Sequence, residues 1–340
     1  MNSRLNKIPM ETWKHLNVNY ADKEFNLPPL EGRRNGPLPT WASDLVSSVG
    51  AGFDREVMMH ADRVNELTVS ANEDRGIVTE VYREGHIIHD SIEVKDKGKV
   101  TLIQLLDGIK DSDVAALTQI RAGKDSEVDL VFVDLCDDLS SVWSAVSVVT
   151  EEGAQVNMVR IAFGCKTSLY GVRADLKGDG SSFDIDTGYF GDKDRILDFN
   201  DVSNFYGKET RSFINSVGVL TGSAKKVLRD TVDFKRGSVH AVGHEKEDVV
   251  MFSDDVINLT TPLILCGEEW VEGQHAATTT RLDDRVMYYL RSRGLTEMQA
   301  RRLVIGSKYA PVIDKIPDNK LREDVYAALM RRIDDNERDH

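Results

Sequence analysis

Three cysteines, Cys136, Cys165 and Cys266, are the side chains of this 340-residue chain best suited to bind a soft metal. They lie far apart in the sequence, and no two of them form a Cys-x-x-Cys pair. An odd and scattered set of this kind predicts neither a disulfide framework nor a zinc site. It also predicts no permanent iron–sulfur cluster, because such a cluster normally takes four thiolates.

The acidic, glycine-rich segment from Asp175 to Asp186 offers a second set of oxygen ligands. A calcium loop needs carboxylates at its first, third and fifth positions and a glutamate at its twelfth. Lys177 stands at the third position and Asp186 at the twelfth, so a solvated turn is favoured. Asp184 and Asp186 also admit an interpretation as the paired acids of a carbohydrate-active enzyme, although alternating acids are more typical of a solvated strand face.

Motifs for nucleotide, dinucleotide and hydrolytic chemistry are missing from the sequence. Gly207-Lys208 lacks the upstream glycine of a P-loop and is followed by Glu209, so ATP hydrolysis by that route is excluded. The sequence contains no G-x-G-x-x-G after a strand, no H-E-x-x-H and no G-x-S-x-G. We therefore expect a protein that is not an enzyme.

The charge and hydropathy of the chain restrict its partners and its compartment. A net charge of −14 disfavours binding to nucleic acid and to anionic membranes, because both depend on clustered Lys and Arg. The first thirty residues contain no apolar signal segment, and no stretch approaches the ~20 apolar residues of a spanning helix. The sequence predicts a cytoplasmic protein.

The middle of the chain is predicted to be mainly β. Short runs rich in Val, Ile, Phe, Thr and Tyr, such as Val100–Leu106 and Val156–Phe163, recur between turn-forming residues. Few helical patterns intervene, which disfavours a doubly wound fold. The only Asn-Gly pair, Asn35-Gly36, lies outside this region, and no strict repeat is visible. The pattern leaves a sandwich and a β-helix as alternatives.

Both ends of the chain are predicted to be helical. In residues 1–75, apolar spacing predicts a helix from about Trp41 to Asn65. In residues 273–340 the pattern predicts three helices. The first ends at Gly294, the second begins with a Thr296–Gln299 capping box and ends at Pro311, and the third runs over 318–333.

Thr261–Thr280 contains an acid-bearing strand followed by His-x-Ala, and Tyr289–Gly294 forms a Tyr-Leu-x-Ser-Arg-Gly helix end. Both segments resemble the SufB/SufD family of iron–sulfur cluster assembly proteins. Asn204–Ser212 resembles the middle of the family, and Ile8–Trp13 the start of its short SufD-like members. The likeness runs from one end of the chain to the other.

The resemblance implies a right-handed parallel β-helix core over residues 76–272, with α-helical segments before and after it. It implies a scaffold subunit that works with a SufC-type ABC ATPase, whose movement is transmitted through the C-terminal helices. It also implies a second SufB/SufD-type chain, in a heterodimer or a homodimer, and a transient iron–sulfur cluster near the dimer interface. No permanently bound cofactor is implied.

His275 falls on the interface histidine of the family, and Glu272 and Cys266 are further candidate ligands of a transient cluster. The apolar run that ends in Cys266 nevertheless favours burial of this thiol. Val256 stands where SufB-type scaffolds have a cysteine, and residues 274 and 276 are not the glutamates of SufB. These departures place the chain nearer the SufD-like or minimal-system branch.

The C-terminal helices carry the expected binding surface for the ATPase. Its candidate residues are Tyr288, Tyr289, Arg291, Arg293 and Arg301, of the aromatic and guanidinium types enriched at protein interfaces. An alternative role for Tyr289 is to cover the end of the coil, since a stacked fold requires a cap.

Overall fold

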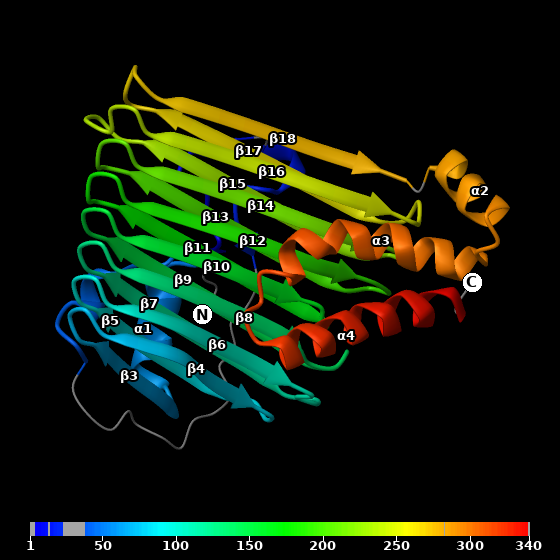
Figure 1. The fold of residues 1–340 in the computed structure, drawn as a ribbon, viewed down its shortest axis with the longest axis horizontal. Helices are drawn as coiled ribbons and strands as arrows, with labels where there is room; N and C mark the ends of the chain where they lie inside the picture. Colours follow the sequence, from blue (N-terminus) through cyan, green and yellow to red (C-terminus); the bar gives the residue numbers. More distant parts are fainter. Residues whose placement is uncertain (1–3, 13, 23–37, 282, 339–340) are drawn as a thin grey trace.

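The computed structural model describes residues 4–12, 14–22, 38–281 and 283–338, and most of them form a coil of parallel strands (Figure 1). Successive strands alternate between two eight-stranded sheets, one in the order β18-β16-β14-β12-β10-β8-β6-β4 and the other in the order β17-β15-β13-β11-β9-β7-β5-β3. The chain is therefore mainly β and forms a parallel β-helix, as the resemblance implied. The right-handed sense of the coil stays a prediction.

The first sheet contains β4 (Asp74–Tyr82), β6 (Lys99–Asp107), β8 (Glu127–Leu135), β10 (Gln155–Ala162), β12 (Ser182–Gly191), β14 (Arg211–Leu220), β16 (Val242–Met251) and β18 (Glu272–Thr280). The second contains β3 (Arg63–Val69), β5 (Ile87–Val94), β7 (Asp113–Ala122), β9 (Ser141–Thr150), β11 (Thr167–Leu176), β13 (Ile196–Phe205), β15 (Lys225–Phe234) and β17 (Ile257–Cys266). The short strands β1 (Arg4–Leu5) and β2 (Ala21–Asp22) pair separately, and the helices are α1 (Ala51–His60), α2 (Asp284–Ser292), α3 (Glu297–Ile313) and α4 (Asn319–Arg338), with 3-10 turns at Lys14–Leu16 and Ala42–Asp44.

Stacking of like residues on successive coils fills the interior between the two sheets. Tyr170 of β11 stacks on Phe199 of β13 with ring centroids 5.3 Å apart, and Phe205 stacks on Phe234 at 4.6 Å. These side chains belong to one continuous core cluster that runs through the coil. We call the strand faces that point into this cluster the inner faces and the opposite ones the outer faces.

The N-terminal segment covers the outer face of the second sheet. Phe53 and Val57 of α1 pack with Leu117 and Trp143, and all four side chains are buried. The amide of Asn6 donates to the carbonyl oxygen of Tyr170 at 3.1 Å, which ties the segment to the sheet. This flank is therefore part of the folded unit.

The C-terminal helices α3 and α4 cover the outer face of the first sheet, across β8 to β14 (Figure 1). Tyr309 is fully buried, lies edge-on to Phe163, and donates its hydroxyl hydrogen to the carbonyl oxygen of Tyr189 at 2.5 Å. Lys315 forms an ion pair with Asp186 of β12. The helices are thus anchored to the side of the coil rather than across its end.

Several element boundaries differ from those predicted. Strands extend beyond residues 76–272 in both directions, since β3 begins at Arg63 and β18 ends at Thr280. The helix predicted from Trp41 is shorter, because Gly50 precedes α1 with a φ of +130°. Pro311 lies inside α3 rather than at its end. In the part of the chain that the structure describes, no helix combines the length and apolar character of a membrane span.

Candidate functional site

The two sheets both stop at β17 and β18, and we call this end of the coil the open end. In the described ranges no strand pairs with the far edge of either one. The backbone N–H of Glu272 donates back to Ala241 at 2.9 Å, so alternate residues of β18 point their N–H groups the other way. The N–H groups of His275 and Ala277 are therefore directed away from the coil.

Pro262 occupies a position of β17 whose backbone nitrogen also points away from the coil. The N–H of Ile257 donates back to Ala224, so the even-numbered positions of this strand point their backbone groups toward the open side. A proline is tolerated there because the hydrogen-bond donor it lacks is not needed within the chain.

His275 lies on the inner face of the last coil, above a buried acid. It is the register partner of Glu245 on β16, and register partners in parallel strands project to the same side. Glu245 is 3% exposed, and burial raises the pKa of its carboxyl to about 10. Burial, and then the charge of Asp201, raises the pKa of the neighbouring Asp230 well above its usual range.

Glu272 does not converge with His275. It lies on the outer face of β18, where its carboxylate bonds to the ring of His244 at 3.1 Å and accepts from the amide of Gln274 at 2.8 Å. Residues three apart in a strand point to opposite faces, so Glu272 and His275 are separated by the strand itself. No group of three potential metal ligands among the described residues includes either of them.

Cys266 is exposed, so the burial favoured by its apolar neighbours is wrong. It is the last residue of β17 and lies in register with Phe234 of the coil below. Because β17 is the edge strand of its sheet, no further coil among the described residues stacks on Cys266. The apolar run had the composition of a buried strand, and only its position at the end of the stack exposes it.

The acids beneath His275 are the residues that the sequence did not single out. Glu247 accepts hydrogen bonds from the ammonium of Lys226 at 2.5 Å and from the hydroxyl of Thr260 at 2.6 Å. Lys226 is fully buried, and burial lowers the pKa of its ammonium group. The alternating acids 245 and 247 could have indicated this inner-face network, but only with the register of the coil in hand.

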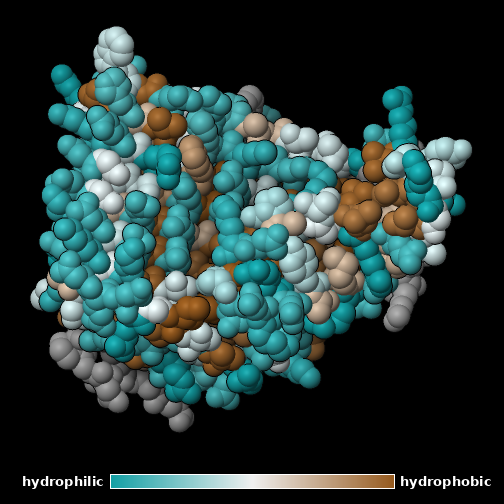
Figure 2. All heavy atoms as spheres, viewed as in Figure 1, coloured by the Kyte–Doolittle hydropathy of each residue, from teal (hydrophilic) through white to brown (hydrophobic). Residues whose placement is uncertain are grey.

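Most of the candidate partner-binding residues lie in α2 or directly after it, and Arg301 lies in α3. Tyr288 is 76% and Tyr289 55% exposed, and the guanidinium of Arg293 lies 5.3 Å from the centre of the Tyr289 ring. Arg291 and Arg301 both form ion pairs with Glu297, at 3.7 and 3.0 Å. Figure 2 shows hydrophobic atoms gathered where α2 meets α3. The exposure of Tyr289 contradicts its alternative role as a cap of the coil.

The proposed acid pair of a carbohydrate-active enzyme is occupied by structural contacts. Asp186 is buried and forms its ion pair with Lys315 of the C-terminal segment. Asp184 accepts from the backbone N–H of Phe213 at 2.9 Å and lies near Arg211. These contacts explain both acids as supports for the packing of the outer face.

The two ends of the coil differ in charge. At the first end, β3 and β4 carry charged side chains, and the pairing of β4 with β6 contains a register shift between Asp74 and Ile77. Charges and bulges of this kind protect a sheet edge from pairing with another chain. At the open end, β17 contains no charged residue and β18 only Glu272 apart from His275. The open end lacks that protection.

Comparison with known proteins places this coil in a family. Residues 78–307 match the family described as "SUF system FeS cluster assembly, SufBD core domain". The chain is 28% identical over 159 residues to the iron–sulfur cluster assembly protein SufD of Bacillus subtilis, covering 47% of this chain and 36% of that protein.

Two further relatives are matched over more of the chain. A SufBD family protein of Mycobacterium bovis is 27% identical over 263 residues, covering 74% of this chain and 59% of the relative. SufD of Escherichia coli is 18% identical over 265 residues, covering 76% and 62%. The chain thus spans about a third to three-fifths of the relatives' lengths. Since the family match covers most of the coil, the chain belongs to the SufBD core-domain family of the SUF iron–sulfur cluster assembly system.

Proposed function

We propose that this chain is a non-enzymatic core subunit of a cytoplasmic SUF assembly complex and pairs through its open end with a second SufB/SufD-type chain. The observation that carries this proposal is the edge of β18, which lacks charged residues after Glu272 and contains no proline, whereas Pro262 interrupts the outward N–H groups of β17. Outward-directed backbone groups at His275 and Ala277 would pair with the edge of another coil. The second chain is either a copy of this one or a related sister.

The nascent cluster, as cargo of the complex, would be assembled at this interface. His275 supports the proposal because its imidazole lies on the last coil, where a partner's groups would meet it. Glu272 faces the other side, and among the described residues His275 belongs to no group of three potential ligands. The remaining ligands would come from the partner, which suits a cluster that is only transiently bound.

The surface around α2 would bind a SufC-type ATPase. Tyr288 and Tyr289 are exposed there beside arginines, the residue types that dominate binding energy at interfaces. The chain after α2 continues into α3, which Tyr309 anchors to β12. A movement of the ATPase could therefore reach the coil through a continuous, packed path.

The proposal is tested by co-purification with a tagged SufC-type ATPase. We expect the wild-type chain to be retained and a Tyr288→Ala/Tyr289→Ala double variant to lose at least ~10-fold in affinity, as for central interface aromatics. Met59→Ala is the matched control, since Met59 is 56% exposed and lies on α1, which packs on the second sheet, far from α2 (Figure 1). Failure of the wild-type chain to bind, or equal retention of all three proteins, would contradict the ATPase assignment.

A further inference from the structure

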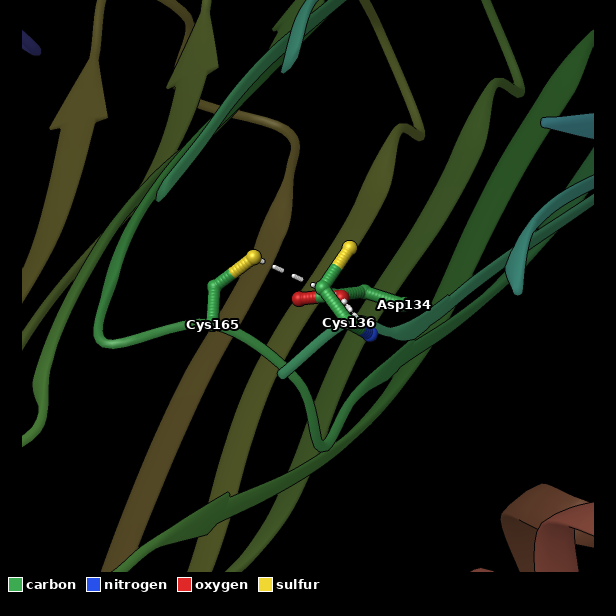
Figure 3. A group of neighbouring side chains, drawn as sticks. All are labelled: Asp134, Cys136 and Cys165. Atoms are coloured by element: carbon green, nitrogen blue, oxygen red, sulfur yellow. Dashed lines mark hydrogen bonds between the residues drawn. The ribbon is translucent and has the colours of Figure 1, made fainter. Parts of the chain in front are cut away.

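Two thiols and a carboxylate meet inside the coil, at the ends of two stacked strands (Figure 3). Asp134 belongs to β8, Cys136 directly follows that strand, and Cys165 follows β10. One ligand atom from each residue lies within 4.8 Å of the other two. The exposed fractions are 0%, 4% and 0%, so the group is enclosed by the core. The coil thus unites two of the three cysteines that looked scattered in the sequence.

The carboxylate is held in a fixed orientation by its neighbours. One oxygen of Asp134 accepts from the backbone N–H of Cys136 at 3.0 Å and faces the sulfur of Cys165 at 3.7 Å. The other oxygen accepts from the hydroxyl of Tyr170 at 2.8 Å. Supporting hydrogen bonds of this type orient the ligands of metal sites in proteins.

The backbone is shaped to let these groups approach closely. A Cβ atom at Gly164 would lie 2.0 Å from the Asp134 carboxylate and 2.4 Å from the backbone nitrogen of Cys136. Cys165 itself adopts a φ of +50°, a conformation that non-glycine residues rarely adopt. Both features place the second sulfur beside the carboxylate.

Positively charged side chains lie beside the three candidate ligands. Arg195 is 2% exposed and donates to the carbonyl oxygens of Gly164 and Cys165, at 2.6 Å for the former. Its guanidinium also forms ion pairs with Asp138 and Asp192. Lys193 and Arg332 pair with the same two acids, so three cations face two carboxylates here. The excess positive charge would offset part of the negative charge of two thiolates and a carboxylate around a divalent ion.

We propose that Asp134, Cys136 and Cys165 bind one divalent cation of the Zn²⁺ or Fe²⁺ type inside the coil. Sulfur ligands select such cations over Mg²⁺ and Ca²⁺. Tetrahedral binding with Zn–S near 2.3 Å needs ligand atoms about 3.5–3.8 Å apart, which small side-chain rotations from the present arrangement provide. Three protein ligands leave a fourth position for a small molecule or for the nearby Tyr170 hydroxyl.

The site is separate from the proposed cluster-assembly position. Strands β10, β12, β14 and β16 lie between β8 and β18 in the first sheet. The proposal therefore does not depend on the proposed function of the open end. Because the site is enclosed, the cation is taken up while the chain folds.

The test is metal loading of the full chain. The protein is refolded anaerobically with Co²⁺ alone, freed of excess metal, and measured for metal content and for thiolate-to-cobalt absorption. We expect about one Co²⁺ per chain with that absorption, loss of both in Cys136→Ser and Cys165→Ser, and no change in Cys266→Ser. Tyr170→Phe should bind the ion about 10- to 100-fold more weakly.

Variants that fail to fold are recognised by circular dichroism, and Asp134→Asn then provides the same test with both thiols in place. The proposal is overturned if the refolded wild-type protein contains no bound Co²⁺. It is also overturned if the Cys136→Ser/Cys165→Ser double variant keeps the thiolate-to-cobalt absorption. A thiol titration of the unfolded, unreduced protein that finds one free thiol instead of three overturns it as well, since Cys136 and Cys165 would then form a disulfide.

Discussion

His275 lies directly above Glu245, its register partner one coil below, and only the acid is shielded from solvent. The open end therefore combines an accessible imidazole with a carboxyl that burial keeps protonated at neutral pH. This pairing makes the stability of the end of the coil sensitive to pH.

Replacement of Glu245 by Gln should flatten the pH dependence of unfolding. The carboxyl ionises near 4.5 in the unfolded chain and only at about 10 in the folded one, so the folded state holds one more proton between these values. The free energy of unfolding of the wild type should then fall as pH rises through this window. Near pH 8, Glu245→Gln should be more stable than wild type by roughly 1–3 kcal/mol.

Urea unfolding between about pH 5 and pH 9 measures this difference. Glu323→Gln, at an exposed position of α4, is the control and should keep the wild-type slope. Parallel profiles of wild type and Glu245→Gln would show that Glu245 is ionised in the folded protein.

Replacement of His275 by Ala should weaken cluster binding. The paired protein is reconstituted anaerobically with iron and sulfide, and its visible absorption is recorded. His275→Ala should lose most of the absorption because the imidazole lies at the proposed interface. His244→Ala is a matched histidine control, since this ring lies on the outer face against Phe213 and should leave the absorption intact. A colourless wild type, or equal losses in both variants, would contradict the role of His275.

Two neighbouring proline substitutions should separate pairing between chains from pairing within the chain. Ala277→Pro removes an N–H that points to the open side and should yield monomers without a large loss of stability. Ala276→Pro removes an N–H that points to β16 and should destabilise the fold itself, by about 3 kcal/mol. Light scattering measures the mass and thermal unfolding the stability. A dimer that survives Ala277→Pro would exclude the open edge as the contact.

The ion pair between Arg160 and Asp201 should be essential to the stability of the coil. Two guanidinium nitrogens bond to the two carboxylate oxygens, one at 3.0 Å, and both side chains are 1% exposed. Asp201→Asn leaves a buried charge unpaired and should cost about 3–5 kcal/mol in denaturant unfolding. Glu152→Gln, which breaks an exposed pair with Lys124, should cost at most about 1 kcal/mol. Similar losses in both variants would contradict this ranking.

The helical tail was predictable because its signals are local. Asp283 caps α2, Gly294 follows it with a φ of +93°, and the Thr296–Gln299 capping box opens α3 as predicted. Pro311 was misjudged because packing overrides its local preference. The buried side chains of Tyr309 and Val312 hold the helix past it against the coil.

The strand content of the middle was predictable from the residue pattern, and the coil only from the family resemblance. The register was predictable from neither. No repeat marks which residues stack, so the meeting of Cys136 with Cys165 was hidden and the facing directions of Glu272 and His275 were undetermined. The first strands were missed because β3 mixes exposed and half-buried positions with charged residues among them, a pattern without a clear apolar face. Local patterns reveal helix ends, whereas stacking partners depend on the length of every turn.

The N-terminal segment and the helices α3 and α4 occupy the two broad sides of the coil. Exposed strand residues therefore remain at the two ends of the coil, on β4 and on β18, while the middle of each outer face is packed against the flanking segments. Under the proposed function, a second chain would pair with the open end and the ATPase would bind at α2, so the two partners would not compete for one surface.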